Sequence, residues 1–151
     1  MSSVEFAHPG EPISKSNAYK RGRGKSFYKD AKYVEYEETL QQAAIEAMGD
    51  NPPFEGPCHI TLRFYFKTYR RKDLTNMPKT ACDALNDIVY LDDTQIVSAE
   101  LEKLYDKENP RVEIIVEELP DDPAYPLTRC KPKKRPRVRK SVRKTAVVPT
   151  D

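Results

Sequence analysis

The segment RRKDLTNMPKTACDALNDIVYLDDTQI, residues 70–96, places five aspartates around one short predicted helix. These are Asp73, Asp83, Asp87, Asp92 and Asp93. We predict the helix over 78–85, because Pro78 suits a first helical turn and Thr75–Asn76 offers side chains that can cap it. Aspartates in such places serve either as ligands of a hard cation or as cap and turn residues, so spacing alone leaves both roles open.

The residues on either side of this segment alternate in hydrophobicity as strands do. Ile60, Leu62, Phe64 and Phe66 alternate with polar residues, which predicts a strand with one buried face. The same alternation over 96–105 and 112–116, with turn residues between them, predicts an antiparallel hairpin, although a helix is the alternative for 96–105. The short apolar run 89–91 predicts a brief strand ahead of Asp92–Asp93.

One long amphipathic helix is predicted over 32–48. Tyr33, Tyr36, Leu40 and Ala44 recur at steps of three and four residues, and the sequence Gly-Asp-Asn-Pro-Pro then ends the helix. A stripe at this spacing is typical of a core-facing side, so we expect the tyrosines to be buried. Together with a short N-terminal strand that stops at Pro9–Gly10, these elements predict a mixed α/β domain.

The charges are divided unevenly along the 151 residues. Of the 26 Lys and Arg, ten lie from Arg129 onward with one of the 24 acidic residues, which leaves 16 basic against 23 acidic residues in the body. The tail repeats proline and charge and offers little to bury, so we predict one folded domain over 1–120 and a disordered basic tail over 121–151. Such a tail suits attraction to nucleic acid, with solubility or an address signal as the alternative.

The chain carries no apolar run of about 18 residues and no N-terminal signal pattern, so we expect no membrane span and a cytoplasmic protein. Its three cysteines show no metal-binding spacing and are expected to be ordinary reduced thiols. Its two histidines, His8 and His59, make histidine-based catalysis improbable.

A basic loop interleaved with aromatic residues follows the first strand, and a second basic run precedes Asp73. Cations of this kind can contact phosphates while the rings contact sugars or bases, although a merely solvated loop is the alternative. The candidate DNA-binding residues are Asn17, Lys20, Arg21, Arg23, Lys25, Arg70 and Arg71.

Asp73, Lys79 and Asp93 are the strongest candidates for chemistry. Mg²⁺ prefers oxygen ligands, and two carboxylates from different elements can supply them if the strand end at Asp73 lies beside the turn at Asp93. Lys79 belongs to the first turn of the predicted helix, where a phosphate would be favoured. A plain surface pair between Lys79 and Asp83, four residues apart on the helix, is the alternative for both.

Several motifs occur together in a family-like order: P-x-S-K-S-N-x-Y, R-R-K-D-L-T-N-x-x-K, D-A-L-N-D-I-V-Y and D-D-x-Q-I. From about Phe6 to Val116 the chain resembles the RusA family of Holliday junction resolvases. The resemblance implies a small mixed sheet with two main helices, a homodimer, and Mg²⁺-dependent cleavage of four-way DNA junctions in recombination and repair. It also implies that the gene is bacterial or belongs to a phage or prophage.

Carried over residue by residue, the resemblance makes Asp73 a metal ligand, Lys79 the essential lysine and Asp93 a later metal ligand, with Asp92 as the neighbour that can be confused with it. Thr75 departs from the family pattern, because a second aspartate commonly stands at that position. A junction-binding module that does not cut, and a nuclease for other replication or recombination intermediates, therefore remain as alternatives to the resolvase.

Overall fold

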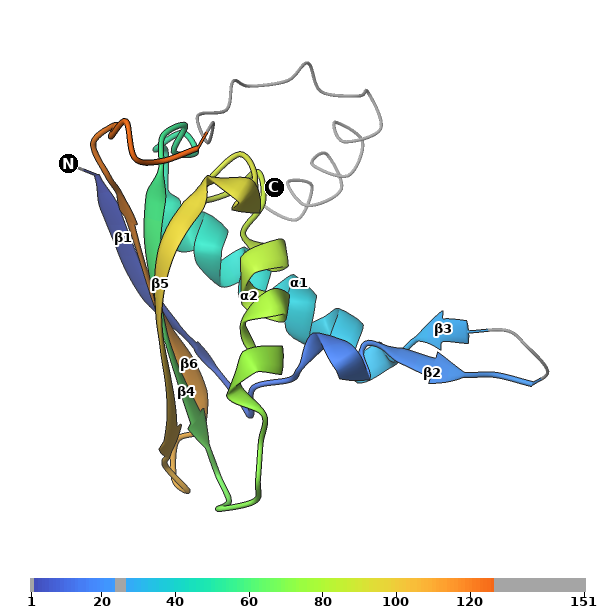
Figure 1. Ribbon diagram of the computed structural model, residues 1–151. Coiled ribbons are helices and arrows are strands. Elements are labelled where there is room, and N and C mark those ends of the chain that lie inside the picture. Colours follow the sequence, from blue (N-terminus) through green and yellow to red (C-terminus); the bar gives the residue numbers. More distant parts are fainter. Residues whose placement is uncertain (1, 24–26, 127–151) are drawn as a thin grey trace, which may run out of the picture.

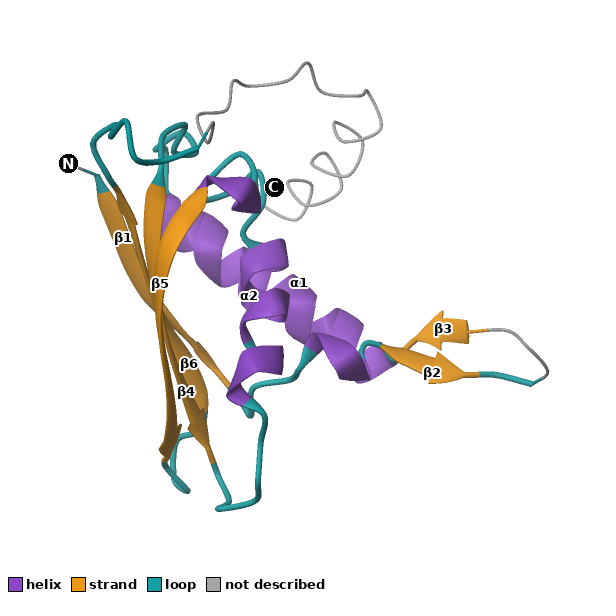
Figure 2. Cartoon of the chain, in the orientation of Figure 1, coloured by secondary structure: helices purple, strands orange, loops and turns teal. Residues whose placement is uncertain are grey.

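Two helices cover one face of a four-stranded mixed sheet (Figure 1). The computed structural model describes residues 2–23 and 27–126. In chain order the elements are β1 (Ser3–Pro9), η1 (Lys15–Asn17), β2 (Tyr19–Arg21), β3 (Phe27–Lys29), α1 (Ala31–Met48), β4 (Cys58–Phe66), η2 (Leu74–Asn76), α2 (Pro78–Ala84), η3 (Asp93–Gln95), β5 (Ile96–Tyr105) and β6 (Arg111–Glu118). The predicted mixed α+β class is confirmed, and Figure 2 shows the helices and the sheet as separate layers.

The strands follow the order β1-β6-β4-β5, so β4 lies between the two strands that come after it in the sequence. β4 pairs antiparallel with β6 and parallel with β5. The predicted hairpin between 96–105 and 112–116 is therefore wrong, although both strands exist. Alternation specifies which face of a strand is buried but not which strand lies beside it, and here β4 takes the place between them. A parallel pair needs a crossover connection, and the segment containing α2 provides it.

α1 begins and ends where the sequence predicts. Its buried residues are Tyr33, Tyr36, Leu40, Ala44 and Met48, which repeat at helical spacing on one side. Gly49 ends the helix with a φ of 57°, a left-handed conformation that glycine adopts without a steric penalty. The prediction that the tyrosines belong to the core is confirmed, since Tyr33 and Tyr36 are 0% and 9% exposed.

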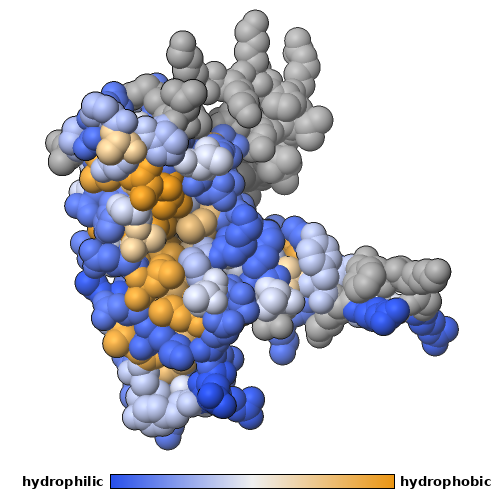
Figure 3. Space-filling model, in the orientation of Figure 1, coloured by the Kyte–Doolittle hydropathy of each residue, from blue (hydrophilic) through white to orange (hydrophobic). Residues whose placement is uncertain are grey.

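The core lies between the helices and one face of the sheet. It joins residues of α1 and α2, such as Leu40 and Ala81, to Ile60, Leu62 and Ile114 of the central strands. Removing this apolar surface from water stabilises the fold by about 25 cal/mol per Å². Figure 3 shows that some hydrophobic side chains remain at the surface of the sheet-and-helix body.

The opposite face of the sheet carries a network of charged side chains. Arg63 Nε donates to Glu102 Oε1 at 2.9 Å, and Arg111 Nη2 lies 3.0 Å from Glu113 Oε2. The Arg111 guanidinium also lies 3.8 Å from the centre of the Tyr65 ring. Since side chains alternate along a strand, these residues point away from the core that Phe64 and Phe66 enter.

Three local predictions differ from the structure. The basic loop folds in part as an antiparallel ribbon of β2 and β3, which extends from the body in Figure 1. Residues 89–91 form no strand; Tyr90 makes isolated bridges to Phe54 and Asn86 instead. Thr75–Asn76 does not cap α2, because both residues belong to η2 and Met77 takes the N-cap position.

The predicted tail lies largely outside the described residues, since only 121–126 belong to the described part. Across residues 2–23 and 27–126, no helix has the length and apolar character needed to cross a membrane. Cys58 and Cys82 are both free thiols, as predicted. Burial raises the pKa of Cys58 to about 12 and that of Cys82 to about 11, so both stay protonated and unreactive near neutral pH.

His8 makes the stability of the fold depend on pH. Its Nε2 lies 2.7 Å from Thr39 Oγ1 and its ring packs edge-on against Tyr36. Burial lowers the pKa of His8 below its value of about 6.5 in an unfolded chain. The unfolded state therefore binds a proton more readily, and the free energy of unfolding falls as the pH decreases from about 6.5 toward the folded-state pKa.

We expect urea unfolding of the wild type to show this loss of stability between pH 7 and pH 5. His8→Gln removes the titrating ring and should weaken the pH dependence over that range, whatever its effect on stability at pH 7. Equal pH dependence in the two proteins would contradict this assignment.

Candidate active site

The buried amide of Gln95 fixes the turn that carries the two consecutive aspartates. Its Oε1 accepts hydrogen bonds from the backbone N–H of Leu91 and of Asp92, each at 2.9 Å. Its Nε2 donates to the carbonyls of Phe54 at 2.8 Å and Gly56 at 2.9 Å. An amide has two acceptor positions and two donor hydrogens, so all of them are satisfied in this fully buried side chain.

Asp92 and Asp93 have different environments although they are adjacent in the sequence. The Asp92 carboxylate caps η3 by accepting from the N–H and the hydroxyl of Thr94, and Gln95 completes the capping box. Asp93 Oδ2 instead lies 3.9 Å from Lys79 Nζ in the first turn of α2. The backbone geometry of the turn therefore directs Asp93, and not Asp92, toward the predicted lysine.

Asp83 joins this pair from the next turn of α2. Lys79 Nζ lies 3.2 Å from Asp83 Oδ1, the contact that the sequence offered as the alternative to a catalytic role, and Lys15 Nζ lies 2.9 Å from Asp83 Oδ2. Asp83 and Asp93 also share a side-chain hydrogen bond. Two carboxyl groups and two ammonium groups thus form one cluster, which we call the acid–lysine cluster: Lys15, Lys79, Asp83 and Asp93.

The two carboxyl groups of this cluster have opposite tendencies to bind a proton. Burial, the hydrogen bond with Asp83 and the charge of Asp92 raise the pKa of Asp93. Burial opposes ionisation of Asp83 as well, but hydrogen bonds from Lys15, Asp93 and Lys79 outweigh it and lower the pKa of Asp83. Asp93 therefore binds a proton more readily than Asp83 does.

The Asp73 carboxylate accepts hydrogen bonds from residues that follow it closely in the sequence. Its Oδ1 accepts from Thr75 N at 3.0 Å and Thr75 Oγ1 at 2.6 Å, and its Oδ2 accepts from Asn76 Nδ2 at 3.1 Å. These bonds, led by the Thr75 hydroxyl, lower the pKa of Asp73, so the carboxylate is ionised. Asp73 thus caps η2, immediately before α2, and Thr75 holds it there.

The structure shows no hydrogen bond or ion pair between Asp73 and the acid–lysine cluster in the described residues. The parallel pairing explains this, because β4 leads to Asp73 from one end of the sheet and Asp93 precedes β5 at the other end. The segment η2–α2 connects the two regions. Asp83, and not Asp73, therefore takes the place beside Asp93.

The carboxyl oxygen atoms around Asp93 are of the type that a hard cation prefers. Crowded carboxyl groups that raise the pKa of one member are stabilised by added positive charge, and Mg²⁺ needs only one or two protein carboxylates beside water and phosphate. Over residues 2–23 and 27–126, no three acidic, histidine or cysteine side chains converge as a ready-made cage. The donor set is thus compatible with an open magnesium site and not with a closed structural one.

Exposed cations lie on two segments outside the acid–lysine cluster. Arg21 and Arg23 are exposed on the ribbon of β2 and β3, and Arg70 and Arg71 are exposed in the loop that follows β4. The ribbon's visible side chains are strongly hydrophilic in Figure 3. The side chains of Asn17 and Lys20, and all of Lys25, lie outside what the structure describes, so their predicted contacts with DNA stay predictions.

A small hollow of about 170 Å³ connects the basic loop to Asp73. Its lining includes Ser14, Ser16, Arg71, Lys72 and Asp73. The first strand's continuation and the loop after β4 therefore meet at this carboxylate, with two cations beside it.

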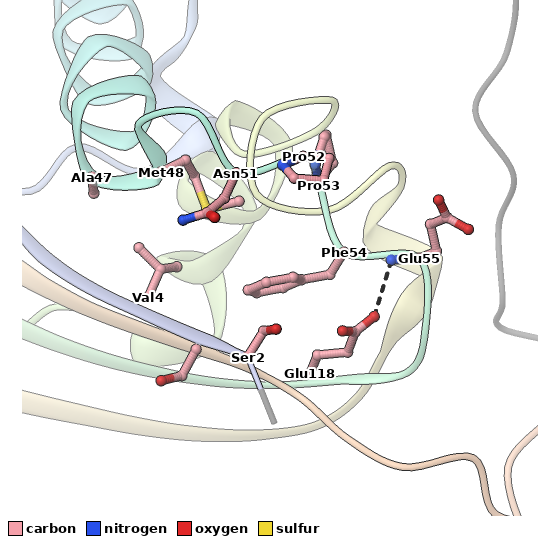
Figure 4. Close-up of a pocket in the computed structure, with 11 residues that line it drawn as sticks. Ser2, Val4, Ala47, Met48, Asn51, Pro52, Pro53, Phe54, Glu55 and Glu118 are labelled. Atoms are coloured by element: carbon pink, nitrogen blue, oxygen red, sulfur yellow. Dashed lines mark hydrogen bonds between the residues drawn. The ribbon is translucent and has the colours of Figure 1, made fainter.

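A larger surface pocket of about 580 Å³ lies away from these residues, between the end of α1, Pro52–Pro53 and the ends of β1 and β6 (Figure 4). Its charged groups are Glu55 and Glu118, and Glu118 Oε2 accepts from the backbone N–H of Glu55 at 3.2 Å and of Gly56 at 2.9 Å. Without a cation in its lining, this pocket is unsuited to a polyanion.

Sequence reasoning assigned no structural role to Gln95, and it placed Lys15 in the basic loop without its contact with Asp83. The D-x-x-Q spacing from Asp92 to Gln95 resembles a capping box and was a usable signal for the first. Lys15 and Asp83 are 68 residues apart, and no local pattern relates them.

Comparison with known proteins places the chain among the endodeoxyribonucleases. The family described as Endodeoxyribonuclease RusA matches residues 9–117, which include the acid–lysine cluster, Asp73 and both exposed basic segments. The chain belongs to this RusA family, whose members act on Holliday junctions. It is also 26% identical over 145 residues to the uncharacterized protein YqaN of Bacillus subtilis, with 79% of this chain and 99% of that protein covered.

We expect Gln95→Leu to destabilise the protein by about 3–5 kcal/mol, because four buried backbone groups lose their partner and each loss costs about 1–3 kcal/mol before relaxation. Urea unfolding measures this change. Gln42→Leu, at an exposed position of α1, is the matched control and should change stability by less than about 0.5 kcal/mol. Similar losses in the two variants would show that the Gln95 amide has no special role.

Proposed function

We propose that the protein is a Mg²⁺-dependent endonuclease that resolves four-way DNA junctions by phosphodiester hydrolysis in recombination and repair. The observation that carries the proposal is the contact of Lys79 with Asp93 and Asp83 at the first turn of α2, in a chain of the RusA family. A carboxylate for a cation, here Asp93, next to a lysine for a phosphate, here Lys79, is what this hydrolysis requires.

Asp93 and Asp73 would hold the metal in this proposal. Burial and the neighbouring carboxylates Asp83 and Asp92 raise the pKa of Asp93, a crowding that a bound cation would relieve, and Asp73 is an ionised carboxylate that caps η2 just before α2. Bound Mg²⁺ supplies positive charge for the phosphate oxygens and lowers the pKa of a water molecule. The capping role of Asp92 supports Asp93 as the ligand, although Asp92 lies close enough to contribute its charge.

Lys79 would stabilise the charge that develops on the phosphate. Its side chain is 61% exposed, so its ammonium group is accessible to a backbone phosphate, and Asp83 fixes its direction. Contacts with Asp83 and Asp93 raise the pKa of Lys79, which keeps it cationic at any physiological pH.

The exposed cations would position the DNA. Because the body as a whole is acidic, binding has to depend on local patches such as Arg21 and Arg23 on the ribbon and Arg70 and Arg71 after β4. A homodimer would bring two centres to opposed strands and produce symmetric cleavage. We place this activity in the cytoplasm of a bacterium, with a phage or prophage as the source of the gene.

A junction-binding protein without cleavage activity is the second candidate. Thr75 favours it, because Thr75 stands where the family commonly has a further aspartate. Its hydroxyl and N–H also donate hydrogen bonds to the Asp73 carboxylate. A nuclease for other branched intermediates is separated from a resolvase by competing substrates in the same assay.

We expect Asp93→Asn and Asp73→Asn each to reduce Mg²⁺-dependent cleavage of a synthetic four-way junction by at least about 100-fold, because each removes a charged metal ligand. Junction affinity, measured in Ca²⁺, should be retained. The single-turnover rate at saturating protein is the quantity to compare.

Asp92→Asn is the matched control, since asparagine caps a helical turn as well as aspartate does. Wild-type cutting by Asp93→Asn, or equal losses in Asp92→Asn and Asp93→Asn, would refute the assignment of Asp93. A wild-type protein that binds the junction and never cuts it would favour the second candidate.

We expect deletion of 129–151 to weaken junction binding more than it slows cleavage at saturation. The tail carries ten cations, and each phosphate contact contributes a slope of roughly −0.9 to the dependence of log affinity on log salt. The truncated protein should therefore show a shallower salt dependence. An unchanged dissociation constant at physiological salt would exclude a role of the tail in binding.

A further inference from the structure

A second lysine enters the acid–lysine cluster from the N-terminal segment. Lys15 Nζ lies 2.9 Å from Asp83 Oδ2, while Lys79 Nζ lies 3.2 Å from Asp83 Oδ1. Each oxygen of one carboxylate therefore holds one ammonium group. The Lys15 side chain is 34% exposed and also lies 6.0 Å from the centre of the Tyr33 ring, so it is packed but not closed off from solvent.

The backbone around Lys15 is fixed to the segment that begins α2. Ser14 caps η1, and its hydroxyl donates to the Asn76 carbonyl at 3.1 Å. Ala18 is fully buried, and its carbonyl accepts from the N–H of Asp30 at 2.7 Å. Lys15 and Lys79 are thus presented by two segments that are bonded to each other, which keeps their ammonium groups near one another before any ligand arrives.

Two neighbouring ammonium groups repel each other, and an anion between them offsets this repulsion by attracting both. Asp83 is that anion. The hydrogen bond and the charge of Asp83 raise the pKa of Lys79 by more than the charge of Lys15 lowers it. An ammonium group has three hydrogens and spends one on Asp83, so each lysine keeps further donors for oxygen atoms of another anion. The arrangement fits one phosphate group of a nucleic-acid backbone.

We propose that Lys15 is a second phosphate-binding lysine of the active centre, and that Asp83 is the positioning residue that holds Lys15 and Lys79 as a pair on one phosphate. This inference deepens the proposed nuclease function and rests on it. Lys15 also stands at the base of the ribbon of β2 and β3, since β2 begins at Tyr19. DNA phosphates bound by the ribbon would therefore be followed along the strand by a phosphate near the acid–lysine cluster.

The first experiment compares single-turnover cleavage of a four-way junction in Mg²⁺ with junction affinity in Ca²⁺. Lys15→Gln should lower the cleavage rate at saturation by about 10- to 100-fold and weaken binding by less than about threefold, because it removes one of several phosphate contacts. Lys15→Arg should recover part of the rate, since it restores the charge. Asp83→Asn should lower the rate as well, and the double variant Lys15→Gln/Asp83→Asn should lose less than the product of the single losses.

The matched control is Arg63→Gln. Arg63 is 36% exposed and pairs with Glu102 at 2.9 Å, but it lies on the face of the sheet away from the helices. The Arg63→Gln variant should keep the cleavage rate and the junction affinity near those of the wild type. Equal effects of Lys15→Gln and Arg63→Gln, or wild-type cleavage by Lys15→Gln, would overturn the proposal, and thermal unfolding shows whether any loss reflects misfolding.

Chemical acetylation of lysines in Ca²⁺ separates this inference from the proposed function. Junction DNA should protect Lys15 and Lys79 from acetylation and leave the exposed Lys107 reactive. Protection without any cleavage in Mg²⁺ would refute the nuclease and support the lysine pair as a phosphate site. Cleavage with Lys15 fully reactive would support the nuclease and refute the pair.

Discussion

The candidate active site depends on the buried amide of Gln95. Four hydrogen bonds from one side chain join the turn before β5 to the loop before β4, two segments about 40 residues apart in the sequence. That connection determines the direction of Asp93, because the turn can hold only one of its two aspartates as a cap. The chemistry around Lys79 therefore relies on a residue that has no contact with it.

The fold could be predicted as far as side-chain periodicity reaches. Helical spacing located α1, and alternation located β4, β5 and β6, because both patterns record which side of an element is buried. The pairing of the strands could not be predicted in the same way. β5 and β6 are adjacent in the sequence and joined by a turn, yet β4 separates them, since only the completed core decides the order of strands that share the same alternation.

The site could be predicted in part for a related reason. Lys79 and Asp83 are one helical turn apart and Asp92 precedes Asp93, so local spacing contained these contacts. The contact of Lys15 with Asp83 arises from the packing of the N-terminal segment on α2, which leaves no trace in spacing. The family resemblance singled out Asp73, but the hydrogen bonds that Thr75 donates to it become visible only in three dimensions.

The uncovered face of the sheet has a consequence for the direction from which DNA can come. On that face Glu102 and Glu113 pair with Arg63 and Arg111, and Glu100 lies beside His59. The ribbon and the loop after β4 instead present mainly cations. A polyanion is repelled from the first surface and attracted to the second, within the screening length of about 8 Å at physiological salt. The two surfaces therefore differ in charge, and the side that carries the ribbon and the loop after β4 is the one that favours a polyanion.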